Sequence, residues 1–185
     1  MSSPGKKIVL AASNSESSEY MKSTWRQMLL ATLPKEYANY ISDVSVKNET
    51  NSDGTAKYVP NGLRVVEALL LENFDSEDIA VCYPDQLDLF VGENTKVVGI
   101  HAHNPLGITF ATDVYAQFYG RETEPINATE FRRLITHPVL KKHKNHIKII
   151  VGGPGSWQIE RRNLQDEWQI DCIVDGEAED VVQDL

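Results

Sequence analysis

Five short apolar runs, rich in β-branched residues, recur along the chain and are separated by polar or helix-like segments. They cover residues 7–12, 79–82, 96–102, 148–151 and 170–174. Continuous apolar runs of this length are typical of parallel strands whose two faces are both buried. Because helical patterns lie between the runs, the sequence predicts an α/β domain with a five-stranded parallel sheet and right-handed crossovers.

Apolar residues at helical spacing occupy most of the gaps between these runs. They predict helices over 17–33, 63–73, 84–90, 110–118 and 156–167, and one over 129–144 with a break at Pro138. Residues 47–57 are rich in Asn, Ser, Asp and Gly and are predicted to form a surface loop. We therefore expect one domain over 1–185 with an inserted helix and loop at about 16–58, and the first turns of a further helix at 178–185.

The fourth apolar run ends in Gly152-Gly153-Pro154-Gly155-Ser156. Glycine allows positive φ and lets another molecule approach the main chain closely. Ligands of open α/β sheets bind beyond the carboxyl ends of the strands, where this turn is expected. The alternative is a strand-to-helix turn that needs glycine for its geometry alone.

A strand order of 2-1-3-4-5 would bring the ends of the first, third and fourth strands beside one crevice. The residues that follow these strands would then line a common pocket. They are Ser13, Asn14 and Ser15, then His101, His103, Asn104 and Pro105, and then residues 152–156.

Charge and hydropathy exclude several classes of partner. With 27 acidic and 18 basic residues, the net charge is -9, which disfavours nucleic acid and anionic membrane surfaces. No apolar run is long enough to span a bilayer, and the polar residues 1–7 lead directly into a strand. We therefore expect a cytoplasmic protein that binds neither nucleic acid nor membrane.

Cysteine and histidine give weak signals. Cys82 and Cys172 lie in apolar runs, so both are predicted to be small buried residues, and two separated cysteines cannot hold an iron-sulfur cluster. His101 and His103 would share one face of a strand, which is a start for metal ligation, but the absence of a third ligand favours polar pocket lining. Solvated charge is expected for the histidines of the lysine-rich stretch, His137, His143 and His146.

Catalytic motifs are absent. The glycine turn matches neither the Walker nor the dinucleotide pattern, and Gly155-Ser156-Trp157 lacks the second glycine of a nucleophile elbow. The acidic residues at 175–180 are typical of the start of a solvated helix. We predict no catalytic residue and no metal ligand in this chain.

Four fragments together resemble the N-terminal cobalamin-binding domain of B12-dependent radical SAM proteins. They are Pro60-Asn61-Gly62-Leu63, Val97-Val98-Gly99-Ile100, Ile149-Ile150-Val151-Gly152-Gly153-Pro154 and Asp171-Cys172-Ile173-Val174-Asp175-Gly176-Glu177-Ala178-Glu179. The resemblance covers about residues 7–180. It implies a flavodoxin-like (Rossmann-type) three-layer fold with sheet order 2-1-3-4-5.

The same resemblance implies a corrinoid partner whose nucleotide tail passes close to Gly152 and Gly153. The pocket lining predicted above would contact this tail, together with Gly176 and Glu177 of the last turn. The family's Asp-x-His-x-x-Gly loop is replaced by Ser13-Asn14-Ser15-Glu16, so we expect base-off cobalamin without a histidine ligand from this loop. His101 stands where serine is common in the family.

In that family a radical SAM domain follows, with its [4Fe-4S] cluster and S-adenosylmethionine. We expect such a domain as a C-terminal partner that the present chain does not include, so that chemistry belongs to the missing part. The main alternative is a cofactor-free docking domain of the same fold. A free-standing nucleotide- or metal-binding enzyme is the third hypothesis.

Overall fold

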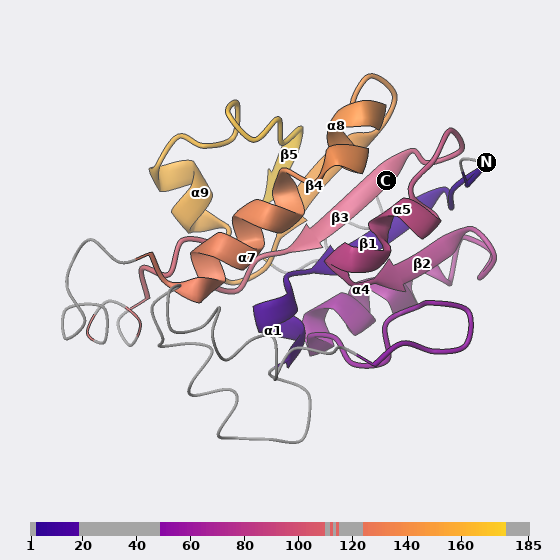
Figure 1. The fold of residues 1–185 in the computed structure, drawn as a ribbon, viewed down its shortest axis with the longest axis horizontal. Coiled ribbons are helices and arrows are strands. Elements are labelled where there is room, and N and C mark those ends of the chain that lie inside the picture. The colour runs from indigo at the N-terminus through magenta and orange to yellow at the C-terminus, as the bar shows by residue number, and fades with distance from the viewer. Residues whose placement is uncertain (1–2, 19–48, 110–111, 113, 115–123, 177–185) are drawn as a thin grey trace.

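A single parallel sheet organises the structure, a computed structural model that describes residues 3–18, 49–109, 112, 114 and 124–176. Its strand order is β2-β1-β3-β4-β5, as Figure 1 shows. The strands are β1 (Ile8–Ala12), β2 (Ile79–Cys82), β3 (Val97–His101), β4 (Lys148–Gly152) and β5 (Cys172–Val174). The predicted α/β, flavodoxin-like fold with order 2-1-3-4-5 is therefore confirmed.

The first strand is central. Ile8 of β1 pairs with Ile79 of β2 on one side and with Val97 of β3 on the other, in parallel register. All five residues of β1 are buried. Since the chain order reverses between β1 and β3, the topological switch point lies where these two strands end.

The helices of the described residues agree with most of the sequence pattern. They are α1 (Asn14–Ser18), α4 (Asn61–Leu70), the 3₁₀ helix η1 (Pro84–Gln86), α5 (Leu87–Phe90), α7 (Ile126–Ile135), α8 (Pro138–His143) and α9 (Trp157–Arg161). The predicted break at Pro138 is confirmed, because this residue begins α8. Proline suits a first helical turn, where its missing N–H has no helical partner.

The helix predicted over 156–167 is shorter than expected. It ends at Arg161, and Asn163 adopts a φ of 53°, which interrupts a right-handed helix. The helices predicted over 17–33 and 110–118 and the segment 178–185 lie wholly or largely outside the described residues.

Helices of the described residues pack on both faces of the sheet. On one face Phe131, Leu134 and Leu140 of α7 and α8 join the large apolar cluster with β1, β3 and β4. On the other face Leu63 and Leu70 of α4 pack on β1 and β2. Figure 1 shows α5, α7 and α8 lying over the sheet on the viewer's side.

The predicted surface loop at 47–57 is fastened to the sheet. Its described part forms an antiparallel bridge between Thr50 and Ala56, and the Ala56 N–H donates to the Val81 carbonyl of β2 at 2.8 Å. Ala56 is buried, whereas residues 51–53 are exposed. The surface prediction is thus wrong for Ala56, because this residue covers the edge of β2.

The two cysteines differ. Cys82 is buried as predicted, and burial raises the pKa of its thiol to about 12. The prediction of burial is wrong for Cys172, which is exposed. Cys172 begins the three-residue strand β5, at the edge of the sheet, where only one neighbouring strand covers it.

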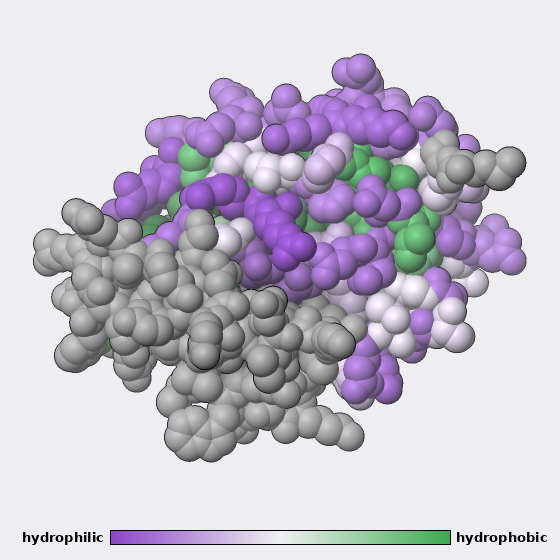
Figure 2. All heavy atoms as spheres, in the orientation of Figure 1, coloured by the Kyte–Doolittle hydropathy of each residue, from purple (hydrophilic) through white to green (hydrophobic). Residues whose placement is uncertain are grey.

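Hydrophilic side chains dominate the face drawn in Figure 2, and hydrophobic residues appear there in small separate groups. The large apolar side chains exposed in the described part of the chain are scattered over three helices and a helix end. They are Val65, Leu71, Leu89 and Trp157. No helix within the described ranges has the length and apolar character needed to cross a membrane.

Candidate functional site

The loops that follow β1, β3 and β4 meet at one end of the sheet, which we call the carboxyl edge. After β1, the described residues Ser13, Asn14, Ser15, Glu16 and Ser17 are all at most 5% exposed. A polar stretch is seldom buried unless its hydrogen-bonding groups find partners. The contacts of these side chains therefore define what the carboxyl edge can bind.

Serine hydroxyls begin α1 directly after β1. The Ser13 hydroxyl accepts a hydrogen bond from the Glu16 N–H at 3.4 Å and lies 3.1 Å from the Ser15 hydroxyl. An N-terminal serine that accepts from a backbone N–H three residues later is a common start of a helix. The predicted position of Ser13 and Ser15 at the strand end is confirmed.

Glu16 joins the loop after β1 to the loop after β3. Its carboxylate accepts from the backbone N–H groups of His103 and Asn104 at 2.9 and 3.3 Å. The second oxygen lies 3.0 Å from Nδ1 of His101. With a side chain only 4% exposed, this carboxylate is stabilised by three donors, and it fixes both strand ends relative to each other.

A second buried network holds the loop after β3 against α9. The Gln158 side-chain amide donates to the Asn104 side-chain oxygen at 3.1 Å and accepts from the Leu106 N–H at 3.0 Å. Asn104 in turn donates to the Thr112 hydroxyl. Gln158 and Asn104 are at most 3% exposed. These amides therefore hold the loop in its conformation and do not form part of the solvent-accessible surface.

The glycine turn after β4 packs against the protein's own backbone. Gly153 has a φ of +112°, and a Cβ there would lie 2.9 Å from the Ala102 carbonyl oxygen. A Cβ at Gly155 would lie 2.1 Å from the His103 carbonyl oxygen. Both glycines are therefore explained by the close approach of two loops of this chain, the alternative that the sequence left open.

The remaining predicted residues are placed less centrally. His103 and Pro154 are exposed, Pro105 is buried, and the Ser156 hydroxyl donates to the Val174 carbonyl at 3.2 Å. A Cβ added at Gly152 would lie 3.4 Å from the Val174 side chain. A Cβ added at Gly176 would have no atom within 4 Å. Glu177 lies outside the described residues.

One hydroxyl at the carboxyl edge lacks a partner. Ser17 is fully buried, and its Oγ has no hydrogen-bond partner within the described part of the chain. Burying an unpaired hydroxyl costs free energy. This atom can therefore still donate to, or accept from, a bound molecule.

An acidic group lies beside α1. Glu130 of α7 hydrogen-bonds Asn14, and burial raises the pKa of its carboxyl, an effect that Arg133 and the Asn14 bond oppose. The nearby Asp85, which pairs with Arg133 at 3.2 Å, also raises the pKa of Glu130. This carboxyl extends the polar surroundings of the β1 end toward η1.

Glu16 and Gln158 are the residues that the sequence prediction missed. The pattern Ser13-x-x-Glu16 is a capping box, in which glutamate is expected to bond back to the backbone of its own helix start. Here the carboxylate bonds to the β3 loop instead. The capping-box pattern could thus have identified Glu16 from the sequence. It would, however, have assigned this carboxylate to the backbone of its own helix and not to the β3 loop.

The predicted pair His101 and His103 does not form a metal site within the described residues. His101 bonds Glu16, and His103 is exposed. The potential metal-ligating group found in the described part of the chain lies at the other end of the sheet and comprises Glu93, His143 and His146. His143 is only 3% exposed, so the expectation of solvated charge is wrong for it.

Comparisons with known proteins gave no match: neither the protein-family models, nor the curated proteins, nor the solved structures include one that is significantly similar.

Proposed function

We propose that this chain is a cobalamin-binding module of a radical SAM enzyme and that the carboxyl edge holds the polar tail of the corrinoid. The observation that carries the proposal is the set of buried polar side chains gathered at the switch point between β1 and β3. In sheets of this order, the crevice at the switch point is the usual place for a ligand.

The residues at this edge suit the tail in chemical kind. A nucleotide tail carries hydroxyl, phosphate and amide groups, and the edge offers hydroxyls, amides and an imidazole. Among the described residues of this edge, the Ser17 Oγ is a buried group without a hydrogen-bond partner. We assign the first contacts of the tail to Ser17, Ser15 and His101.

The chain's own residues would position the cofactor rather than react. A bound corrinoid would supply organometallic cobalt chemistry, and the expected partner domain would supply the iron-sulfur cluster and S-adenosylmethionine. Glu16 holds the two strand-end loops at a fixed spacing, and no histidine follows β1 to ligate cobalt. The expected binding mode is therefore base-off without a protein ligand from this loop.

A cofactor-free docking domain is the rival function. The observation in its favour is that Glu16, His101, Asn104 and Gln158 satisfy one another. A network that is complete without a ligand has less to gain from binding one. The two proposals differ in whether a molecule binds against His101.

Titration of the purified chain with hydroxocobalamin, followed by desalting and visible absorbance, separates these functions. Gly62→Trp is the informative variant, because a Cβ at Gly62 would lie 3.6 Å from Nε2 of His101 and meets no backbone. Its indole would lie against the imidazole. Ala68→Trp is the matched control, since Ala68 is exposed on the same helix α4.

We expect the parent and Ala68→Trp to retain corrin absorbance. Gly62→Trp should bind hydroxocobalamin at least tenfold more weakly. Equal retention by all three proteins would place binding elsewhere. No retention by the folded parent chain would overturn the cobalamin proposal and favour the docking domain.

A further inference from the structure

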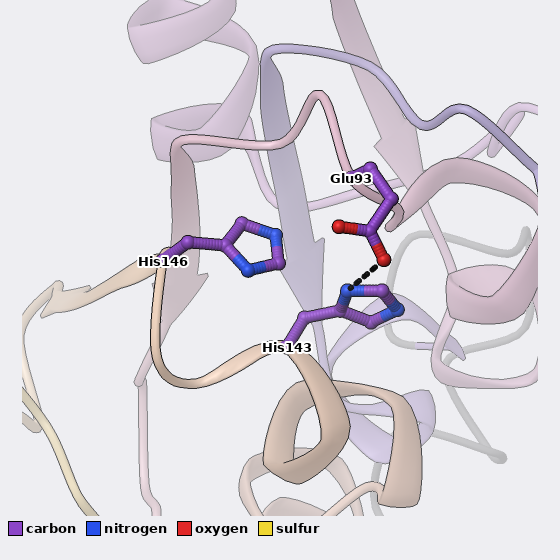
Figure 3. Close-up of side chains that lie close together, drawn as sticks. All are labelled: Glu93, His143 and His146. Atoms are coloured by element: carbon purple, nitrogen blue, oxygen red, sulfur yellow. Dashed lines mark ion pairs between the residues drawn. The ribbon is translucent and has the colours of Figure 1, made fainter.

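Three potential metal ligands converge at the amino edge of the sheet, the end at which β3 and β4 begin. Glu93 lies in the turn ahead of β3, His143 ends α8, and His146 lies in the loop ahead of β4. One ligand atom from each lies within 4.8 Å of the other two. Figure 3 shows the two imidazoles and the carboxylate turned toward a common space.

The backbone around these residues is held in place by hydrogen bonds. The Gly92 N–H donates to the Thr95 hydroxyl at 3.0 Å, and the Thr95 N–H donates to the Gly92 carbonyl at 3.1 Å. The N–H groups of His146 and Ile147 both donate to the His143 carbonyl, at 3.1 and 3.2 Å. Two closed turns therefore present the three side chains, and little backbone ordering is needed for binding.

The contact of His146 selects a tautomer that suits a metal. Its Nε2 lies 3.3 Å from the Gly92 carbonyl oxygen, which can only accept a hydrogen bond, so Nε2 carries the hydrogen. In the neutral ring Nδ1 then keeps a lone pair. Donation of the second ring N–H to a backbone carbonyl is the usual outer contact of a metal-bound histidine.

The other two ligands make only a long contact with each other. Nδ1 of His143 and Oε1 of Glu93 are 3.7 Å apart, within ion-pairing range, as the dashed line in Figure 3 marks, but beyond hydrogen-bonding distance. The imidazoles of His143 and His146 meet edge to face, with centroids 5.2 Å apart. His143 is buried while the Glu93 side chain is 73% exposed, so the carboxylate is free to close onto an ion held by the histidines.

Neighbouring lysines are partly neutralised. Lys144 and Lys148, which flank the loop of His146, both form ion pairs with Asp171. Burial acts to raise the pKa of Asp171, but the hydrogen bonds from Lys144, the Ile149 N–H and Lys148 together lower it. Among the described residues, these two ammonium groups therefore pair with Asp171 and not with Glu93.

We propose that Glu93, His143 and His146 bind a divalent transition-metal ion, for which Zn²⁺ is the best match. Two imidazoles and one carboxylate form a borderline-soft ligand set, whereas Ca²⁺ and Mg²⁺ require mostly oxygen ligands. Tetrahedral Zn²⁺ places neighbouring ligand atoms about 3.4 Å apart. Rotation of the exposed Glu93 side chain supplies the closure, and water completes the coordination.

Bound metal would tie the turn ahead of β3 to the loop ahead of β4. This site lies at the opposite end of the sheet from the proposed cobalamin site and does not depend on it. Failure of either proposal therefore leaves the other unaffected.

The test is calorimetric titration of the chelator-treated, full chain with ZnCl₂, with MgCl₂ as the ion control and Co²⁺ absorbance as a coordination probe. His146→Gln and Glu93→Gln are the test variants, because both side chains are exposed and their replacement leaves the core intact. His103→Gln is the matched control, since His103 is an exposed histidine at the carboxyl edge.

We expect one Zn²⁺ per chain with micromolar or tighter affinity, no Mg²⁺ binding, and a tetrahedral Co²⁺ spectrum. His146→Gln and Glu93→Gln should each weaken Zn²⁺ binding at least tenfold, while His103→Gln leaves it unchanged. Absence of stoichiometric binding by the parent, or equal affinity of the parent and both test variants, would overturn the proposal.

Discussion

The two ends of the sheet each contain a glutamate beside a histidine, but the pairs differ in how fully their hydrogen bonds are used. At the carboxyl edge, Glu16 is buried and has three donors within 3.3 Å. At the amino edge, Glu93 is exposed and 3.7 Å from His143. The first carboxylate is therefore part of the fold, whereas the second is available for a ligand.

This difference teaches that residue type alone does not identify a site. A buried carboxylate whose oxygens already accept three hydrogen bonds has little left for another molecule, and an exposed carboxylate in a long contact keeps its capacity. Three predictions test this comparison.

The largest expected effect is the difference in stability between the variants Glu16→Ala and Glu93→Ala. Removal of the Glu16 carboxylate leaves the N–H groups of His103 and of the buried Asn104 without this acceptor, so the free energy of unfolding should fall by about 4 kcal/mol. In metal-free buffer, Glu93→Ala should change it by less than about 0.5 kcal/mol. Urea unfolding of both variants provides the measurement, and similar losses in the two would contradict the comparison.

A smaller effect is expected from closing the glycine turn further. Gly155→Ala places a Cβ against the His103 carbonyl and the Pro105 ring, and it should destabilise the protein by about 3 kcal/mol. Gly176→Ala is the control. Gly176 has a φ of +105° but open space around it, so this substitution should lower the free energy of unfolding by about 1 kcal/mol. Thermal unfolding of both variants provides the measurement. Equal losses of stability would contradict the close contact of Gly155 with the loop after β3.

The smallest expected effect concerns the pH dependence of Glu130. Burial raises the pKa of this carboxyl above its ordinary value of 4.5, so the unfolded chain releases the proton at lower pH than the folded one. Folding stability therefore falls as pH rises from 4.5 through the folded-state pKa. Glu130→Gln, which does not titrate, should gain stability relative to the parent across that interval.

Stability curves of the parent and Glu130→Gln between pH 4 and 7 give the check. The opposite trend, in which the stability of the parent rises relative to that of the variant as pH rises, would contradict this prediction. It would show that Arg133 and the Asn14 bond affect the pKa of Glu130 more than burial does.

The strands were predictable because they depend on local composition, whereas the order of the strands was implied by the family resemblance. Residues 79–82 are apolar and include the β-branched Ile79 and Val81, and they form β2 over the same range. The helix break at Pro138 was equally visible. These features follow from steric and burial rules that act within a few residues.

Contacts between distant segments were not predictable from such patterns. Glu16 meets the β3 loop 87 residues later, and the capping-box rule describes only its own helix. His143 stands among lysines, yet the turn at the end of α8 carries its ring into the protein. Cys172 lies in an apolar run, but its place in an edge strand exposes it.

The central place of β1 has a consequence for synthesis of the chain. Ile8 pairs with Ile79 and Val97, so neither neighbour of this strand exists until those residues have left the ribosome. At roughly 5 to 20 residues per second, that delay lasts several seconds or longer. A strand that is buried along its whole length in the folded protein thus spends this time as an exposed apolar segment.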